Sequence, residues 1–253
     1  MGLSIPEVCG NACPALFLNY TLQKSIPKEQ ILMRMFHFLR KFLEITFLNY
    51  NQAMLTVVIQ AGGESRRMGR DKALIPFLGK PLIMHIYERV KSLADEVLIT
   101  TNYPEDYSFL ELPLRKDIVK ERGALGGIYT ALKSANNPMV AIVACDMPFA
   151  SPELLSMARD RLIGEQVDAV IPRSEDGLEP LHAVYRRKTC IPAVKWALES
   201  GEWKVTSWFS KVELAFIEVE ELRIYDPEQI AFWNVNTVEE LERAQDYVLS
   251  GMK

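Results

Sequence analysis

The stretch Ala61-Gly62-Gly63-Glu64-Ser65-Arg66-Arg67-Met68-Gly69-Arg70-Asp71-Lys72 decides the fold. The run before it, Leu55-Thr56-Val57-Val58-Ile59, is short, apolar and rich in β-branched residues, so it predicts a buried strand. Residues 73–82 predict a turn that leads into a helix. A glycine pair and several cations therefore leave the carboxyl end of a parallel strand, which is where open α/β sheets bind ligands.

This stretch has the composition of a polyphosphate-binding loop. Gly62 and Gly63 lack a Cβ, so their backbone can approach a ligand and present N–H groups to phosphate oxygens. Arg66, Arg67 and Lys72 supply positive charge. The absence of a Gly-Lys-Ser/Thr ending excludes a Walker A loop, and the absence of G-x-G-x-x-G excludes the dinucleotide fingerprint. The remaining alternative is a plain Gly-Gly turn with solvated cations.

Composition indicates an ordinary soluble enzyme. The chain has 253 residues, 49% of them apolar and 25% charged, with a net charge of -4. That length suits one large α/β domain or two small ones. The small negative net charge gives no overall positive potential of the kind that attracts nucleic acid. The 4 cysteines are too few and too scattered for a disulfide framework. We therefore expect reduced thiols and a cytoplasmic location.

Residues 1–53 form an N-terminal extension before the strand–helix pattern. Residues 28–48 predict an amphipathic helix, whose interspersed charges argue against a membrane span. No basic segment opens the chain as in a secretory signal. The helix is suited to a partner or a membrane surface, or else the natural start is Met54 and the extension reflects an upstream start codon.

After Met54, predicted strands and helices alternate. The strands are expected at 96–100, 139–144, 168–172, 180–185 and 212–219, and the helices at 81–93, 123–134, from 152, at 191–199 and after Thr237. This alternation predicts a three-layer α/β/α sandwich with a mostly parallel central sheet, a Rossmann-like architecture.

Two candidate sites follow from the residues alone. Asp146 follows the wholly apolar run 139–144 after one residue, Cys145, so its carboxylate is poorly placed for solvent and well placed to hold Mg²⁺. The alternative for Asp146 is a helix cap or a turn acid. The glycine-spaced segment 123–127 opens a helix whose backbone amides suit an anion, or its glycines serve only close packing.

The motif Ala-Gly-Gly-x-Ser-x-Arg-Met-Gly-x-Asp-Lys resembles the signature of the molybdenum cofactor guanylyltransferases, which are nucleotidyltransferases with a glycosyltransferase-A-like fold. Segments 123–127, 145–148, 180–185 and 234–237 are similar to later segments of that family. The resemblance runs from Val57 to about Ala244, so it implies a nucleotidyltransferase domain over 54–253 and leaves out 1–53.

The resemblance implies roles for individual residues. Lys72 and Arg67, with Asp146 as the Mg²⁺ ligand, are the catalytic set. The nucleotide-binding set adds Gln60, Ala61, Gly62, Gly63, Thr100, Asn102 and Asp117. His182, Asn234 and Asn236 border the acceptor, although a lone histidine is more often structural and the asparagines also suit a helix cap.

Asp117 is expected to accept hydrogen bonds from guanine N1–H and N2–H, a pairing that cytosine does not offer. The alternative is that this loop aspartate only forms a turn or caps a helix. The family places an asparagine for the nucleoside near the end of the second strand. Here ungapped alignment puts Thr100 at that position, and Asn102 follows two residues later.

The reaction implied is transfer of GMP from GTP to molybdenum-bearing molybdopterin, with pyrophosphate released and Mg²⁺ as cofactor. Molybdoenzymes or their chaperones are the implied protein partners, and neither nucleic acid nor membrane insertion is expected. No Ser/His/Asp or Cys/His constellation stands out, which fits a reaction without a protein nucleophile. Two alternatives stay open: a CTP-dependent or sugar-phosphate nucleotidyltransferase, and a nucleotide-binding regulatory module without turnover.

Overall fold

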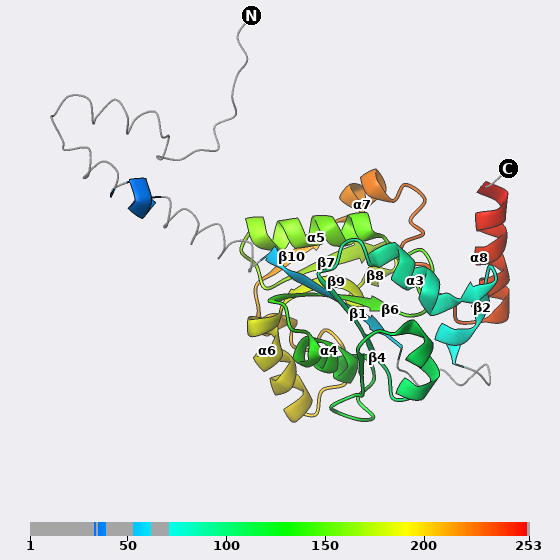
Figure 1. Ribbon diagram of the computed structural model, residues 1–253, viewed down its shortest axis with the longest axis horizontal. Coiled ribbons are helices and arrows are strands. Elements are labelled where there is room, and N and C mark those ends of the chain that lie inside the picture. Colours follow the sequence, from blue (N-terminus) through cyan, green and yellow to red (C-terminus); the bar gives the residue numbers. More distant parts are fainter. Residues whose placement is uncertain (1–32, 34, 39–52, 62–70, 252–253) are drawn as a thin grey trace, which may run out of the picture. The chain divides into compact units, whose positions relative to one another are not determined.

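A computed structural model describes Met33 and residues 35–38, 53–61 and 71–251 (Figure 1). The chain divides into two compact units, Met1–Asn49 and Tyr50–Lys253. In the first unit the described residues are helical and their side chains are exposed. The rest of the predicted extension helix and most of the glycine-rich loop, 62–70, lie outside the described residues, so the extension boundary at residue 53 stays a prediction.

Strands and helices alternate in the second unit, as the sequence predicts. The strands are β1 Leu55–Gln60, β4 Glu96–Thr100, β5 Leu114–Arg115, β6 Met139–Ala144, β7 Ala169–Ser174, β8 Gly177–Leu178, β9 His182–Arg186 and β10 Leu214–Ile217, with a small hairpin of β2 Pro76–Phe77 and β3 Lys80–Pro81. The helices are α3 Leu82–Val90, α4 Gly123–Ser134, α5 Pro152–Gly164, α6 Arg187–Glu199, α7 Val219–Tyr225 and α8 Val238–Gly251, with 3-10 turns η2 Lys72–Leu74, η3 Pro104–Leu110 and η4 Phe209–Lys211.

The central sheet has the strand order β10-β7-β9-β6-β1-β4-β5, and β8 pairs with β7. β1 lies between β4 and β6 and is parallel to both, with Gln60 opposite Thr100 on one side and Ala144 on the other. β9 is antiparallel to both β6 and β7. Helices α4 and α6 cover one face of the sheet, and α3 and α5 cover the other (Figure 1). The predicted three-layer α/β/α sandwich with a mostly parallel sheet is confirmed.

The alternation of side chains along β1 places its last residue. Val57 and Ile59 pack into the core under α3 and α5, whereas Val58 packs into the core under α4 and α6. Successive side chains of a strand point to opposite faces. Gln60 therefore continues the α4 side of the sheet, two residues beyond Val58.

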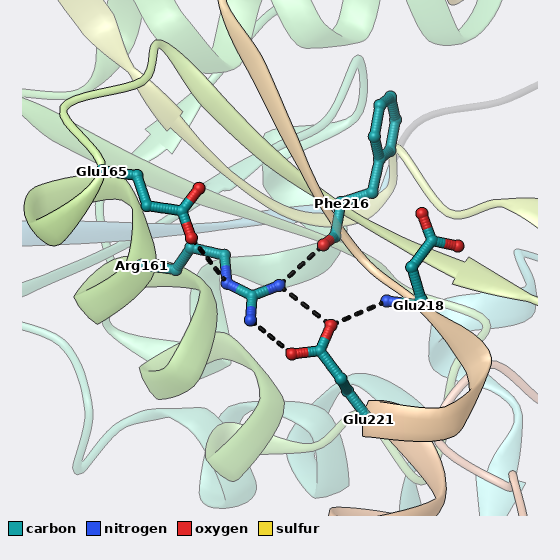
Figure 2. A network of polar contacts seen from close by, with 5 residues as sticks. All are labelled: Arg161, Glu165, Phe216, Glu218 and Glu221. Carbon is teal, nitrogen blue, oxygen red and sulfur yellow. Dashed lines mark hydrogen bonds and ion pairs between the residues drawn. The ribbon is translucent and has the colours of Figure 1, made fainter.

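A polar network on the α5 side holds α7 against the sheet (Figure 2). The guanidinium of Arg161 donates to the carbonyl oxygen of Phe216 at 2.7 Å and binds both carboxylate oxygens of Glu221. The Arg161 Nε also pairs with Glu165 at 3.3 Å. The hydrogen bonds with Arg161 lower the pKa of Glu221 more than its partial burial raises it. This bidentate contact explains how so short a helix is anchored.

Several predicted boundaries were wrong. The predicted helix 81–93 ends at Val90, and the predicted strand 180–185 begins at His182. α6 begins at Arg187 rather than Ile191, so Pro192 lies inside the helix instead of at its first turn. The predicted strand 212–219 is shortened to β10, because Val219 already opens α7 behind a capping box formed by Glu218 and Glu221. Within the described residues, no helix combines the length and apolarity that crossing a bilayer requires.

Candidate active site

The carboxyl ends of β1, β4 and β6 meet at one edge of the sheet. The Ala61 N–H donates to the carbonyl oxygen of Thr100 at 2.8 Å, and the Cys145 N–H donates to that of Gln60 at 3.0 Å. The backbone segments that follow β1, β4 and β6 therefore stay hydrogen-bonded to one another just beyond the ends of the strands. Asp146 follows immediately, so the edge gathers residues that the sequence assigned separately to nucleotide and metal.

Lys72 returns to this edge from the glycine-rich loop. It is buried, with 9% of its surface exposed, and its Nζ donates to Asn236 Oδ1 at 2.6 Å. A lysine is seldom buried unless it is paired. The structure therefore brings together two predicted site residues from opposite ends of the domain, which the sequence had placed on different substrates.

Asp71 fixes the backbone that carries Lys72. Its Oδ1 accepts from the Ala73 N–H at 3.1 Å and caps η2. Its Oδ2 accepts a 2.6 Å hydrogen bond from the hydroxyl of Tyr107, a side chain with no exposed surface. Burial, followed by this hydrogen bond, raises the pKa of Tyr107 well above its usual value. The sequence does not predict this contact, because no motif connects η3 with the glycine-rich loop.

Asp146 lies directly behind β6, as predicted. Its carbonyl oxygen accepts from the Val235 N–H at 2.8 Å, which ties this strand end to the segment that leads into α8. Desolvation by burial raises the pKa of its carboxyl group; Lys72 acts in the opposite direction, and Glu240 adds to the rise. A partly buried anion that lacks full compensation is suited to a cation.

The donor set fits a magnesium ion that relies on its substrate for ligands. Within the described ranges, no group of three or more His, Cys, Asp or Glu side chains forms a protein cage. Mg²⁺ is commonly held by one or two carboxylates together with substrate phosphates. Asp146 provides one such carboxylate beside Lys72, whose ammonium group also attracts phosphate.

The segment before α8 holds Asn236 in place. Glu240 Oε2 accepts from the Asn236 N–H at 2.6 Å and the Thr237 N–H at 3.0 Å, while the Glu240 N–H donates to Thr237 Oγ1 at 3.1 Å. This confirms the predicted Thr237 cap. Asn234 uses its Nδ2 on the carbonyl oxygen of Phe232 at 3.1 Å. Only Asn236 directs its amide oxygen at Lys72.

Asp117 and Asn102 form a pair at the β4 side of the edge. Asn102 Nδ2 donates to Asp117 Oδ2 at 2.8 Å, and the Asp117 N–H donates to Asn102 Oδ1 at 3.3 Å. Thr100 is 2% exposed, whereas Asn102 is exposed and already bonded to Asp117. Between the two candidates for the nucleoside contact, the geometry favours Asn102.

Gln60 lies between these groups and the start of α4. It is 8% exposed, and within the described part of the chain its Nε2 is buried without a hydrogen-bond partner. A Cβ on Gly127 would come within 2.9 Å of Gln60 Oε1. Glycine at 127 therefore leaves the space that the amide occupies, which supports the packing interpretation of this glycine.

His182 is a buried structural contact. It has no exposed surface, and its Nε2 accepts from the Ser151 N–H at 3.0 Å, where Ser151 caps α5. The ring meets Phe232 edge-on at 5.3 Å between centroids. Burial lowers the pKa of His182 to about 4, so the imidazole is neutral. Its expected place beside the acceptor stays a prediction.

Comparison with known proteins identifies the family of this chain. The model of the MobA-like NTP transferase domain matches residues 57–213. A molybdenum cofactor guanylyltransferase from Desulfosudis oleivorans is 36% identical over 201 residues, which is 78% of this chain and 97% of that relative. The chain belongs to the molybdenum cofactor guanylyltransferase family. It is therefore a nucleotidyltransferase.

Other members of this guanylyltransferase family and more distant folds extend the comparison. A probable molybdenum cofactor guanylyltransferase from Peptoclostridium acidaminophilum is 35% identical and covers 74% of this chain and 87% of its own. The molybdopterin-guanine dinucleotide biosynthesis protein A of Archaeoglobus fulgidus superimposes with a TM-score of 0.67 at 28% identity, over 77% of this chain and 99% of that one. A 4-diphosphocytidyl-2C-methyl-D-erythritol synthase from Anaerococcus prevotii shares the fold, with a TM-score of 0.59, 15% identity and coverage of 78% of this chain and 96% of that one.

Proposed function

We propose that this enzyme transfers GMP from GTP to molybdenum-bearing molybdopterin in the cytoplasm and requires Mg²⁺. The observation that carries the proposal is the meeting of Lys72 and Asp146 at one sheet edge, where Lys72 binds Asn236 and Asp146 binds the adjacent Val235. Family membership supplies the reaction class. The opposite charges of the two groups suit a triphosphate together with its counter-ion.

The proposed reaction needs no protein nucleophile. A terminal phosphate oxygen of the pterin cofactor attacks the α-phosphorus of GTP, forming a new P–O–P bond. The α–β bridge breaks, and pyrophosphate leaves with the bonding electron pair. Catalysis is then mainly positioning and stabilisation of developing charge. The ammonium group of Lys72, pre-oriented by Asn236, neutralises charge on the departing phosphates.

Asp146 would hold Mg²⁺, which supplies further neutralisation of phosphate charge when it is bound. Gly62, Gly63 and Arg67, outside the described residues, are assigned to the phosphates by their motif. The acceptor side is assigned to Asn234 and Asn236 on the same basis, whereas His182, which has no exposed surface, is expected to contribute only through packing. Delivery of the product to molybdoenzymes or their chaperones completes the proposed role.

Guanine selection is assigned to Asp117. Its carboxylate accepts hydrogen bonds, as guanine N1–H and N2–H require, and Asn102 orients it from the side. Loss of such a pairing leaves a base edge unsatisfied and costs roughly 1–3 kcal/mol. We therefore expect GTP to be preferred over CTP.

A turnover panel tests the proposal. Pyrophosphate release from GTP, CTP, ATP and UTP would be measured with molybdenum-loaded and empty molybdopterin, each with and without Mg²⁺. GTP with the loaded acceptor and Mg²⁺ should give the highest rate. Equal turnover of CTP would contradict the base assignment, and nucleotide binding without turnover of any triphosphate would point to a regulatory module.

A further inference from the structure

The side-chain amide of Gln60 lies at the sheet edge where β1, β4 and β6 end, and within the described residues its Nε2 has no hydrogen-bond acceptor. A buried amide that lacks a partner destabilises a folded protein, so it is an unusual end for a core strand. The neighbouring polar residue of β1, Thr56, shows the ordinary arrangement: its hydroxyl donates to Glu96 Oε2 at 2.6 Å. Gln60 Nε2 has no equivalent acceptor within the described residues.

The surroundings of this donor suit an uncharged part of a nucleotide. Gln60 faces α4, whereas Lys72 is paired to Asn236 and associated with Asp146. A neutral amide offers no charge to a phosphate, but it matches the donors and acceptors of a base edge. In the parallel register Gln60 stands opposite Thr100, two residues before Asn102, which is bonded to Asp117.

The two side chains are chemically complementary to guanine. A carboxylate accepts hydrogen bonds only, so Asp117 can serve the N1–H and N2–H donors but cannot reach the remaining group, the O6 acceptor, with a donor of its own. Gln60 Nε2 is the missing donor. Gly127 takes part by leaving room, because a side chain there would collide with the amide.

We propose that Gln60 is a specificity-determining residue, whose Nε2 donates to guanine O6 while Asp117 accepts from N1–H and N2–H. This inference rests on the proposed use of GTP. It assigns the two halves of the base edge to two separate residues. The assignments can therefore be tested independently by changing one atom or group of the nucleotide at a time.

The test compares Gln60→Met with the unmodified enzyme on three nucleotides. Methionine keeps the length of the side chain and removes its donor. 6-Thio-GTP replaces O6 by sulfur, a weaker acceptor, and ITP lacks only the 2-amino group. The unmodified enzyme should favour GTP over 6-thio-GTP by about tenfold in kcat/KM, the scale of one hydrogen bond. Gln60→Met should bring that ratio close to one while keeping the preference for GTP over ITP.

Asp117→Ala should give the reverse pattern, with the discrimination against ITP lost and that against 6-thio-GTP kept. Gln245→Met is the matched control, since Gln245 Oε1 already accepts from the Leu78 N–H at 3.3 Å. Both of its ratios should be unchanged. Melting temperature gives a second readout: Gln60→Met should melt at the same temperature or higher, whereas Gln245→Met should melt lower because Leu78 loses its acceptor.

The outcomes separate this inference from the function on which it rests. If the unmodified enzyme uses GTP and Gln60→Met keeps the full 6-thio-GTP discrimination, the Gln60 role is overturned and the guanylyltransferase proposal stands. If the unmodified enzyme prefers a base without an O6 acceptor, the function fails and the O6 assignment fails with it. A drop in melting temperature of Gln60→Met equal to that of the control would show a structural amide instead.

Discussion

The phosphate side and the base side of this site differ in how far the protein satisfies its own polar groups. On the phosphate side Lys72 is bonded to Asn236, and Asp71 is bonded to Tyr107. On the base side Gln60 keeps a buried donor without a partner in the described residues. The ammonium group of Lys72, which must act on phosphates, is thus fixed in advance, whereas the neutral amide of Gln60, proposed to read the base, is left open. Preorganisation of this kind favours catalysis, whereas an open donor favours discrimination.

The largest effect should come from Asp146→Asn, which tests whether the phosphate side depends on charge. Asparagine keeps the shape of the side chain and removes the anion that Mg²⁺ requires. Turnover should fall by on the order of a hundredfold or more, since several kcal/mol of charge stabilisation disappear. The melting temperature should be unchanged or higher, because burial raises the pKa of this carboxyl group and so disfavours its charged form.

Turnover of this variant would be measured across a Mg²⁺ titration, alongside its melting curve. A folded Asp146→Asn enzyme with near-normal, Mg²⁺-dependent turnover would show that the residue is only a structural cap. The preorganised phosphate side would then have to work through Lys72 without a metal ligand from β6.

Asn236→Ala should have the second-largest effect, on the order of tenfold in kcat/KM. It leaves Lys72 in the site but removes the oxygen that orients its ammonium group, which costs about one charge-assisted hydrogen bond. Asn136→Ala is the matched control, because Asn136 donates to Glu96 at the opposite end of the strands. The control should lower stability only. If both variants kept the same activity, the hydrogen bond from Lys72 to Asn236 would not be needed for the function of Lys72.

The order of elements and the two central site residues could be predicted because their signals are local. The apolar composition of 139–144 predicts a buried strand, and the position of Asp146 just after this run predicts that it lies at the end of that strand. Lys72 is likewise placed by the glycine-rich motif. The bond between Lys72 and Asn236 spans 164 residues, and no periodicity or spacing encodes it.

Other features depended on tertiary context. α7 was not predicted, because its first residue, Val219, was assigned to the strand 212–219 and its anchor is Arg161 of another helix. The unsatisfied amide of Gln60 is a property of its surroundings and not of its residue type. One missed contact did carry a signal: Thr237 followed three residues later by Glu240 is a capping-box spacing, which fixes the backbone of Asn236.

Tyr107→Phe should reduce turnover by about three- to tenfold, a smaller effect, because it acts through Asp71 on the position of Lys72. The ring and its packing remain, and only the hydroxyl is removed. Tyr185→Phe is a close control: Tyr185 is equally buried, and its hydroxyl donates to the carbonyl oxygen of Pro180 at the same distance, 2.6 Å. Each variant should lose about 1 kcal/mol of unfolding free energy.

Only Tyr107→Phe should lose turnover, mostly in kcat, because a displaced Lys72 weakens stabilisation of the departing phosphates more than ground-state binding. Parallel kinetics and denaturant unfolding of the two variants decide the point. Equal turnover at equal stability loss would mean that Asp71 does not need its hydroxyl partner, and that the phosphate side is less tightly fixed than its contacts indicate.

The smallest effect on activity is expected for His182→Gln, which alters a buried polar contact of the core. The glutamine Oε1 can accept from the Ser151 N–H as His182 Nε2 does, but it does not titrate. Burial lowers the pKa of His182 to about 4 in the folded protein, below the usual 6.5, so the unfolded chain binds the proton first as pH falls. The residue's contribution to stability is therefore present above pH 6.5 and is lost progressively down to pH 4, by at most about 3 kcal/mol.

Unfolding free energies measured from pH 7 to pH 4 should decline less steeply for His182→Gln than for the unmodified enzyme, with GTP turnover at pH 7 nearly equal. Parallel pH profiles would mean that the imidazole is not held neutral by burial, and a large loss of turnover with unchanged stability would instead place His182 at the acceptor.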